Sequence, residues 1–167
     1  VTGSGKTEVY IKLAAEAIKH NKTIIILVPE ISLTPQLSKK FIDTFGQKVA
    51  LWHSKLTKRE KYKTWQFLKQ KKYSIIIGAR SAIFSPIPEL GLIIIDEEHD
   101  SSYKQDITAF KYHARDVALV RAKYSNSTIV MGSATPSIES YYYAINKKNQ
   151  LLQINSRYNN AAYPTIK

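Results

Sequence analysis

Residues 1–29 read VTGSGKTEVYIKLAAEAIKHNKTIIILVP, and this stretch decides the fold class. Five apolar residues after the glycines fall on one face of a helix that we predict over residues 6–20: Val9, Leu13, Ala14, Ala17 and Ile18. A continuous run of mainly β-branched residues at 23–28 follows and stops at Pro29, as expected for a strand. An unbroken apolar strand is typical of a parallel sheet buried on both faces, so the pattern favours an α/β protein.

The same alternation of helix and strand patterns continues to about residue 146. Thr34 and Pro35 have the residue types of a helix N-cap and first helical position, and Thr57 is a second N-cap candidate. The further expected helices cover 35–45, 58–68, 113–124 and 137–146, and the further expected strands cover 49–51, 73–77, 92–95 and 127–131. We therefore predict an α/β fold with a parallel β-sheet flanked by helices on both faces.

The composition excludes several classes of protein. With 167 residues, of which 44% are hydrophobic, the chain can bury the core of one domain and lacks the composition of disorder. It has no Cys, which excludes a disulfide scaffold, a Cys-ligated zinc site and a thiol nucleophile. Its apolar runs are far shorter than the roughly 20 residues of a membrane-spanning helix, and no signal peptide opens it. We expect a cytoplasmic protein with no membrane contact.

The net charge of +12 favours a polyanionic partner such as nucleic acid, because Lys and Arg bind phosphates. A second explanation stays open: Lys outnumbers Arg by 20 to 5, which AT-biased codon usage produces regardless of function. The segment from Lys55 to Arg80 is strongly basic, and we expect most of its charges on the solvated face of a helix. Trp52 and Trp65 are expected to pack in the core or between helices.

Residues 1–7 match the phosphate-binding loop GxxxxGKT except for its first glycine, which would lie before Val1. In such a loop the backbone N–H groups wrap a phosphate at the N-terminus of a helix. The loop predicts that Gly3, Ser4, Gly5, Lys6 and Thr7 bind a nucleotide. Lys6 would reach the β- and γ-phosphates and the Thr7 hydroxyl would bind Mg²⁺. The alternative is a flexible Gly-Ser-Gly turn before a helix capped by Ser4.

A second motif, DEEH at residues 96–99, follows the apolar run at 92–95. It places acids at the carboxyl end of a buried strand, where α/β sheets bind ligands. We assign Asp96 to Mg²⁺ and Glu97 to the water that attacks the phosphate. The alternative is an acidic loop that only solvates the end of the strand.

A third motif, GSAT at residues 132–135, completes an order of motifs that resembles motifs I, II and III of the superfamily 2 helicases. Five further strings resemble one family within that group, the primosomal replication-restart helicases: VPEISLTPQ (28–36), WHS (52–54), GARSAIF (78–84), DEEHDSSYKQ (96–105) and YHARD (112–116). The resemblance extends from Val1 to about Ser140.

This resemblance implies a RecA-like P-loop NTPase lobe over residues 1–155, followed by a linker at 156–167. It implies a DEAH-type, ATP- and Mg²⁺-dependent DNA helicase of 3′-to-5′ polarity, which acts at stalled or abandoned replication forks in replication restart and primosome assembly. The partners it implies are single-stranded and forked DNA, single-strand-binding protein and other primosome proteins. The location it implies is the bacterial cytoplasm, associated with the nucleoid.

The family's roles transfer to matching positions. The resemblance assigns catalysis to Lys6, Asp96 and Glu97, and the coupling of hydrolysis to movement to His99, Ser133 and Thr135. Its expected DNA contacts are Pro29, Thr34, Arg80, Ser81, Tyr103, Lys104, Phe110 and Lys111. The chain has Ala79 where the family usually has Thr, and Phe110 where it more often has Trp.

Residues 101–112 resemble the aromatic-rich loop with which these helicases sense single-stranded DNA. Planar side chains that stack on bases, next to Lys residues that meet phosphates, bind single strands without reading their sequence. The alternative for each aromatic residue is that it packs beneath the loop.

The same family carries a strand before the phosphate loop, and a second lobe with an arginine finger and a Cys-rich zinc insertion. We expect these parts before Val1 and after Lys167, and no zinc within residues 1–167. Without an arginine finger the isolated chain is expected to be nearly inactive. Two alternatives stay open: another superfamily 2 DNA translocase, which the strings around Pro29 and Ser101 oppose, or a non-catalytic basic DNA-binding fragment.

Overall fold

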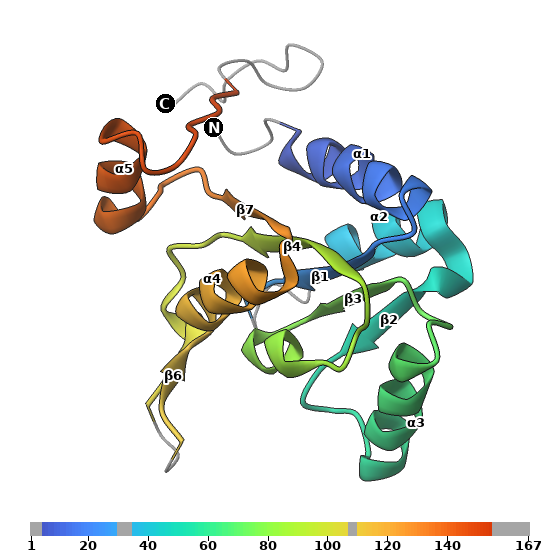
Figure 1. The fold of residues 1–167 in the computed structure, drawn as a ribbon. Coiled ribbons are helices and arrows are strands. Elements are labelled where there is room, and N and C mark those ends of the chain that lie inside the picture. Colours follow the sequence, from blue (N-terminus) through green and yellow to red (C-terminus); the bar gives the residue numbers. More distant parts are fainter. Residues whose placement is uncertain (1–4, 30–34, 107–109, 155–167) are drawn as a thin grey trace, which may run out of the picture.

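The computed structural model describes residues 5–29, 35–106 and 110–154, in which helices and strands alternate along the chain (Figure 1). The α-helices are α1 (Lys6–Lys19), α2 (Pro35–Phe45), α3 (Lys58–Lys69), α4 (Ala114–Ser125) and α5 (Ile138–Ile145). The strands are β1 (Thr23–Leu27), β2 (Val49–Trp52), β3 (Ile75–Gly78), β4 (Leu90–Asp96), β5 (Lys104–Gln105), β6 (Tyr112–His113) and β7 (Thr128–Gly132). Short 3₁₀ helices are η2 (Gly46–Lys48), η3 (Arg80–Phe84) and η4 (Ser101–Tyr103).

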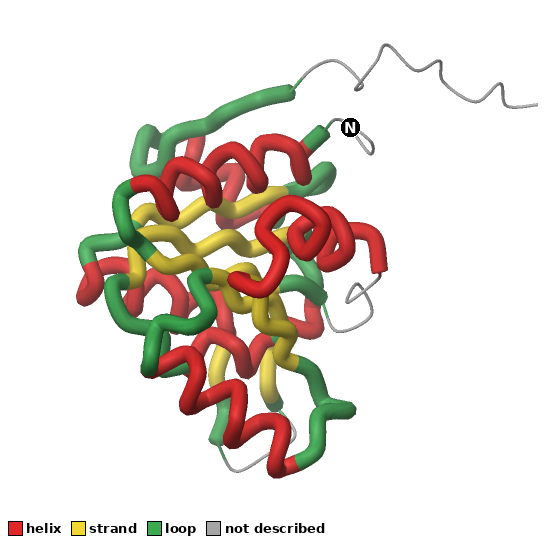
Figure 2. Tube along the Cα trace, turned by 90° about the vertical axis from the view of Figure 1, so that its right-hand side faces the viewer, coloured by secondary structure: helices red, strands yellow, loops and turns green. Residues whose placement is uncertain are grey.

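Five strands form one sheet in the order β2-β3-β1-β4-β7, and every neighbouring pair in it is parallel. β1 lies at the centre, where Ile26 pairs with Ile77 of β3 on one side and Ile94 of β4 on the other. Helices lie against both faces of this sheet, as Figure 2 shows. The predicted α/β fold, a parallel sheet flanked by helices, is therefore confirmed.

The unbroken apolar strands supply two cores at once, because successive side chains of a strand point to opposite faces. Ile24 and Ile26 of β1 pack on one face, in a cluster that includes Tyr10 of α1 and Phe41 of α2. Ile25 and Leu27 pack on the other face, in a cluster with Leu68 of α3 and three small residues of α4: Ala114, Ala118 and Ala122. The continuous run therefore consists of two alternating sets, both buried.

The ends of the helices follow the predicted caps closely. Thr57 and Glu60 form a reciprocal capping box at the start of α3, in which the Thr57 side chain accepts from the Glu60 N–H. Gly46 follows α2 with a left-handed φ of 57°, a conformation that glycine adopts without strain. Thr34, the expected cap of α2, lies outside the described residues.

A small antiparallel hairpin was not expected from the sequence. β5 pairs with β6, with Lys104 opposite His113, and the hairpin projects from the body of the sheet next to α4 (Figure 1). Its strands have only two residues each, too few for a period-2 pattern to be recognised. None of the helices in the described ranges is long and apolar enough to span a membrane.

Replacing Ile26 by Ala tests the two-sided core. Ile26 is fully buried in the central strand, so removing three carbons leaves a cavity and should lower the free energy of unfolding by about 2–5 kcal/mol. Urea unfolding followed by circular dichroism measures the change. Ile138→Ala is the matched control, because Ile138 is 86% exposed and its loss should change stability by less than about 0.5 kcal/mol. Equal effects would contradict the proposed core.

Candidate nucleotide site and adjoining groove

The motifs found in the sequence meet at the carboxyl edge of the sheet. β1 ends before Pro29, β3 ends at Gly78, β4 ends at Asp96 and β7 ends at Gly132. Because parallel strands point the same way, the residues that follow them share one edge, which is where open α/β sheets bind ligands. The start of α1, with Lys6 and Thr7, reaches the same edge through contacts with Asp96 and Glu97.

Lys6 and Glu97 form a direct ion pair across this edge. Lys6 Nζ donates to Glu97 Oε1 at 2.6 Å, and both side chains are half-buried. Gly5 precedes them with a left-handed φ of 90°, which a residue with a Cβ would adopt only with strain. Among the described residues no side chain caps this end of α1, so its first N–H groups can meet an anion.

Two tyrosines hold Asp96. The Tyr10 hydroxyl donates to Asp96 Oδ1 at 2.9 Å, and the Tyr103 hydroxyl donates to the Asp96 backbone carbonyl at 2.5 Å. Burial raises the pKa of Asp96 above its usual range, although the hydrogen bond from Tyr10 opposes this. Burial, and then the nearby Asp96 charge, raise the pKa of both tyrosines, so both remain proton donors. The two contacts fix the side chain and the backbone of Asp96 independently.

Glu97, the second acid of the DEEH motif, has a left-handed backbone conformation between Asp96 and Glu98. Glu97 has φ 47°, a conformation that costs a non-glycine residue roughly 1 kcal/mol or more. The turn sends Glu97 toward Lys6 and leaves the Glu98 N–H to donate to the Gly132 carbonyl at 3.1 Å. Glu97 and Glu98, although adjacent in the motif, therefore contact different parts of the molecule.

His99 contacts residues of both the DEEH motif and the GSAT motif. Its Nδ1 lies 2.7 Å from Ser133 Oγ and its Nε2 lies 3.4 Å from Thr135 Oγ1. The same Nδ1 lies 3.7 Å from Glu97 Oε2. The Ser133 hydroxyl also accepts from the Thr135 N–H at 2.9 Å. A continuous set of polar contacts thus runs from Lys6 through Glu97 and His99 to the GSAT segment.

Glu98 takes no part in that set and faces the other way. It is only 2% exposed, and it accepts hydrogen bonds from the Ser137 N–H at 2.7 Å, from the Ser140 hydroxyl at 2.9 Å and from Arg115 Nη1 at 3.3 Å. Burial alone would raise the pKa of Glu98, but these donors more than offset it and hold the pKa below its usual range. No role of Glu98 was predicted from the sequence; in the structure it joins the end of β4 to α4 and α5.

The residues present fit a nucleoside triphosphate with Mg²⁺. The uncapped start of α1 and the Lys6 ammonium suit phosphate oxygens. Thr7 and Asp96, the expected Mg²⁺ ligands, lie on segments that the Tyr10–Asp96 hydrogen bond holds together. Within the described ranges no three His, Asp or Glu residues gather as a metal cage. Mg²⁺ bound through one or two protein oxygens, phosphates and water needs no such cage. Gly3 and Ser4 lie outside the described residues.

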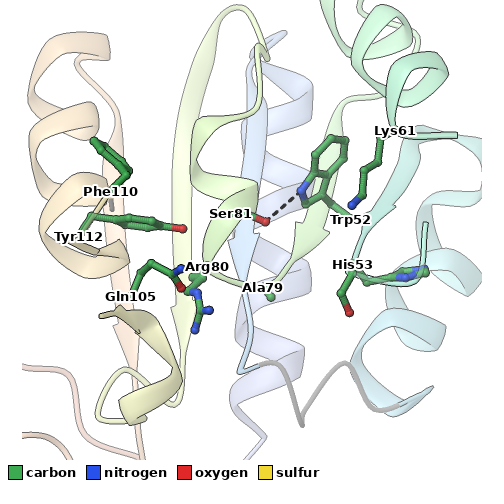
Figure 3. Close-up of a pocket in the computed structure, with 10 residues that line it drawn as sticks. Trp52, His53, Lys61, Ala79, Arg80, Ser81, Gln105, Phe110 and Tyr112 are labelled. Carbon is green, nitrogen blue, oxygen red and sulfur yellow. Dashed lines mark hydrogen bonds between the residues drawn. The ribbon is translucent and has the colours of Figure 1, made fainter. Parts of the chain in front are cut away.

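A groove adjoins the nucleotide site along the same edge. It is an open hollow of about 280 Å³, with Phe110 and Tyr112 on one side and Trp52 and Lys61 on the other (Figure 3). Arg80 lies between the two sides. The Trp52 indole N–H donates to Ser81 Oγ at 3.1 Å, which fixes the ring against η3. Aromatic faces on opposite sides, together with basic side chains, form a surface suited to binding single-stranded nucleic acid.

Arg80 also supports the hairpin wall of this groove. Its Nη1 donates to the carbonyl of Ser102 at 2.9 Å and lies 3.5 Å from that of Lys104. Burial raises the pKa of Tyr112, and the neighbouring Arg80 guanidinium opposes that rise. Phe110 and Tyr112 form a cluster of edge and tilted ring contacts with Phe84 of η3. The wall is therefore held from both η3 and η4.

The residues expected to contact DNA lie in different surroundings: some line the groove or are exposed, and others are buried. Arg80, Ser81 and Phe110 line the groove, and Lys104 and Lys111 are exposed near it in the chain. Tyr103, the last residue of η4, is fully buried, and its hydroxyl donates to the Asp96 carbonyl, so the expectation that its ring stacks on DNA is wrong. Pro29 is also buried, so its side chain is not available for direct contact with a DNA strand. Thr34 lies outside the described residues.

The groove residues outside the predicted contacts include Trp52, His53 and Lys61, whereas Tyr112 belongs to the aromatic-rich segment 101–112 that was expected to stack on bases. Trp52 packs against Trp65, with ring centroids 6.3 Å apart, and it also forms a groove wall. The string WHS at 52–54 begins with the last residue of β2, and its position at the end of a strand was the signal that could have found it. The role of Tyr10 was also not predicted, although its position four residues after Lys6 on α1 was a signal that could have found it.

Comparison with known proteins adds independent information. Residues 1–142 match the family described as DEAD/DEAH box helicase. The chain is similar to the replication restart protein PriA of Bacillus subtilis (strain 168), with 47% identity over 99% of this chain and 20% of that protein. It is similar to the PriA of Synechocystis, with 52% identity over 85% of this chain and 17% of that protein. The PriA of Rickettsia felis is 45% identical over 99% of this chain and 26% of its own length.

The chain thus spans 17–26% of the length of these relatives. Among solved structures, the helicase domain of Pyrococcus furiosus Hef matches 87% of this chain and 31% of its own chain, with a TM-score of 0.57. The sequence identity is 19%, so this likeness supports the RecA-like fold and nothing further.

Glu98→Ala tests the buried carboxylate that joins β4 to α4 and α5. Removing it takes the buried carboxylate from Arg115 and the acceptor from the Ser137 N–H, and should lower the free energy of unfolding by about 3–5 kcal/mol. Urea unfolding measures the loss. Glu139→Ala is the control, because Glu139 is an exposed acid in the first turn of α5. Glu98→Gln should cost less, since its amide oxygen still accepts from Ser137. A Glu98→Ala protein as stable as Glu139→Ala would refute the role.

Proposed function

This chain belongs to the DEAD/DEAH box helicase family, and from that membership we propose that it is the ATP-binding lobe of a 3′-to-5′ DNA helicase that acts in replication restart. The relatives named replication restart protein PriA, at 45–52% identity, support that more specific assignment. Helicases of this family use ATP and Mg²⁺. We propose that residues 1–155 form the lobe and that 156–167 lead to the next one.

One observation carries the proposal: Lys6, Asp96 and Glu97 converge at the carboxyl edge of the sheet. Lys6 contacts Glu97 at 2.6 Å, and Tyr10, one turn further along α1, holds Asp96 at 2.9 Å. Residues 91 and 86 positions apart in the chain are thereby joined. A lysine at a helix N-terminus opposite two carboxylates is the arrangement that phosphoryl transfer to water requires.

Each residue has a distinct task in this proposal. Gly3, Ser4, Gly5 and Lys6 bind the phosphates of ATP, and Thr7 and Asp96 hold Mg²⁺, which when bound neutralises charge on the phosphates. When Lys6 turns to a phosphate, the Glu97 carboxylate loses its partner and can orient a water molecule. His99 then links Glu97 to Ser133 and Thr135, which carry the change toward the DNA side.

The groove is the proposed path of single-stranded DNA. Trp52, Phe110 and Tyr112 offer ring faces to bases, while Lys61 and Arg80 supply positive charge for phosphates. The net charge of +12 supports a polyanionic partner over the whole molecule. We further propose that forked DNA, single-strand-binding protein and other primosome proteins are partners, and that the protein works in the bacterial cytoplasm on the nucleoid.

The ATP site is tested by DNA-stimulated hydrolysis in the protein extended to the natural ends of its reading frame. Lys6→Ala and Glu97→Gln should each lower turnover at least about 100-fold, the typical contribution of one group that stabilises the transition state. Release of phosphate with and without oligo-dT is the measurement. Lys12→Ala is the control, an exposed lysine on the same helix.

Full turnover in Lys6→Ala would refute the assignment of the site. DNA binding with no turnover in the unsubstituted protein would favour the alternative, a non-catalytic basic DNA-binding module. We further propose that an arginine finger of a second lobe completes the site, so the 167-residue chain by itself should hydrolyse ATP at least about a thousandfold more slowly than the extended protein.

Phe110→Ala tests the groove. Phe110 is 67% exposed on the hairpin wall, and loss of one stacking ring should weaken binding of oligo-dT about 5- to 150-fold. Fluorescence anisotropy of a labelled oligonucleotide at fixed salt measures the affinity. Tyr124→Ala is the matched control, an aromatic residue of α4 that is 87% exposed and does not line the groove. Equal affinities for the two variants would place the DNA elsewhere.

A further inference from the structure

We propose that Tyr10 is a positioning residue for Asp96, and that residue 132 is glycine because the Tyr10 hydroxyl occupies the space of its side chain. Tyr10 lies in α1, Asp96 ends β4 and Gly132 ends β7, so one side chain joins three segments of the site. The proposal rests on the function proposed above, in which Asp96 holds Mg²⁺.

The contact with Asp96 is direct and protected from water. Tyr10 is 3% exposed, packed with Ala14 of the same helix in the core beneath α1 and α2. From there its hydroxyl donates to Asp96 Oδ1 at 2.9 Å. A carboxylate with one oxygen fixed in this way presents its other oxygen in one orientation. Groups that orient a metal ligand typically contribute 10- to 100-fold to metal affinity or activity.

Gly132 supplies the second, independent observation. A Cβ built on Gly132 would overlap the Tyr10 hydroxyl oxygen and would lie only 2.9 Å from Cζ of the ring. The φ of Gly132 is not left-handed, so the backbone conformation does not require glycine there. The constraint is therefore the space that Tyr10 fills. Because Asp96 pairs with Gly132 in the sheet, a side chain at 132 would displace Tyr10 from Asp96.

This arrangement gives α1 a second hold on the catalytic edge. Lys6 contacts Glu97, and one turn later Tyr10 contacts Asp96, so a shift of α1 on phosphate binding reaches both carboxylates. It also reaches Gly132, the first residue of the GSAT motif. Tyr10 thereby sets where Asp96 lies relative to the phosphate loop without touching the nucleotide.

The test compares Tyr10→Phe, Gly132→Ala and the double variant in the protein extended to its natural ends. Binding of a fluorescent ATP analogue is measured in EDTA and over a series of Mg²⁺ concentrations, together with thermal unfolding and DNA-stimulated turnover. Tyr124→Phe controls for loss of a hydroxyl at an 87% exposed site, and Lys6→Ala reports on the proposed function itself.

Tyr10→Phe is expected to raise the Mg²⁺ concentration for half-maximal effect about 10-fold, while binding of the analogue in EDTA stays unchanged. Gly132→Ala should have at least the same effect, since it displaces the whole ring. In the Tyr10→Phe background the added alanine should raise the Mg²⁺ requirement by less than a further factor of about 3, because the hydrogen bond to Asp96 is already lost and only the ring carbon Cζ remains near the new Cβ. This non-additivity identifies the shared space.

Three results would overturn the inference. One is an unchanged Mg²⁺ dependence in Tyr10→Phe. Another is an equal loss of affinity with and without Mg²⁺ that follows a lowered melting temperature, as a merely structural role predicts. The third is additive effects of the two substitutions. Turnover that survives in Lys6→Ala would instead refute the proposed function, so the two failures are distinguishable.

Discussion

The burial of the parallel sheet on both faces is the constraint on which the rest of the structure depends. Ile24 to Leu27 and their neighbours on β3 and β4 have no exposed face, so helices must cover both sides. Covering both sides forces crossover connections, and these point every strand the same way. The carboxyl ends then share an edge, and polar residues that cannot enter the core collect there. The chemistry of the molecule is located by its hydrophobic packing.

Within that edge, Asp96 is held through both its side chain and its backbone. Tyr10 holds its side chain and Tyr103 holds its backbone, each from a different segment. The left-handed turn at Glu97 then distributes the acids: Glu97 faces Lys6, whereas Glu98 turns into the interior and anchors α4 and α5. A short motif thereby links the phosphate loop, the GSAT segment and the helices beyond it, which requires that its residues face different directions.

Tyr103 also connects the two functional regions. Its flanking carbonyls, those of Ser102 and Lys104, meet Arg80 in the groove, while its own hydroxyl meets Asp96. Its burial excludes the stacking role that the aromatic-rich sequence suggested. The groove instead takes its aromatic faces from Phe110 and Tyr112 on the hairpin and from Trp52 at the end of β2. Arg80 is thus shared between supporting the hairpin and facing the groove.

The sequence by itself determined the fold class, the order and approximate limits of the helices and of the five strands of the main sheet, and the motif residues at the ends of β4 and β7. These depend on periodicity, caps and spacing, which are local properties of the chain. It did not determine that Tyr103 is buried, that Glu98 leaves the site, that Tyr10 holds Asp96 or that Trp52 lies opposite Phe110. Those facts depend on the strand order β2-β3-β1-β4-β7 and on which side chains of distant segments fill the same space. Only tertiary packing decides this, because burial and hydrogen bonding belong to neighbours in space.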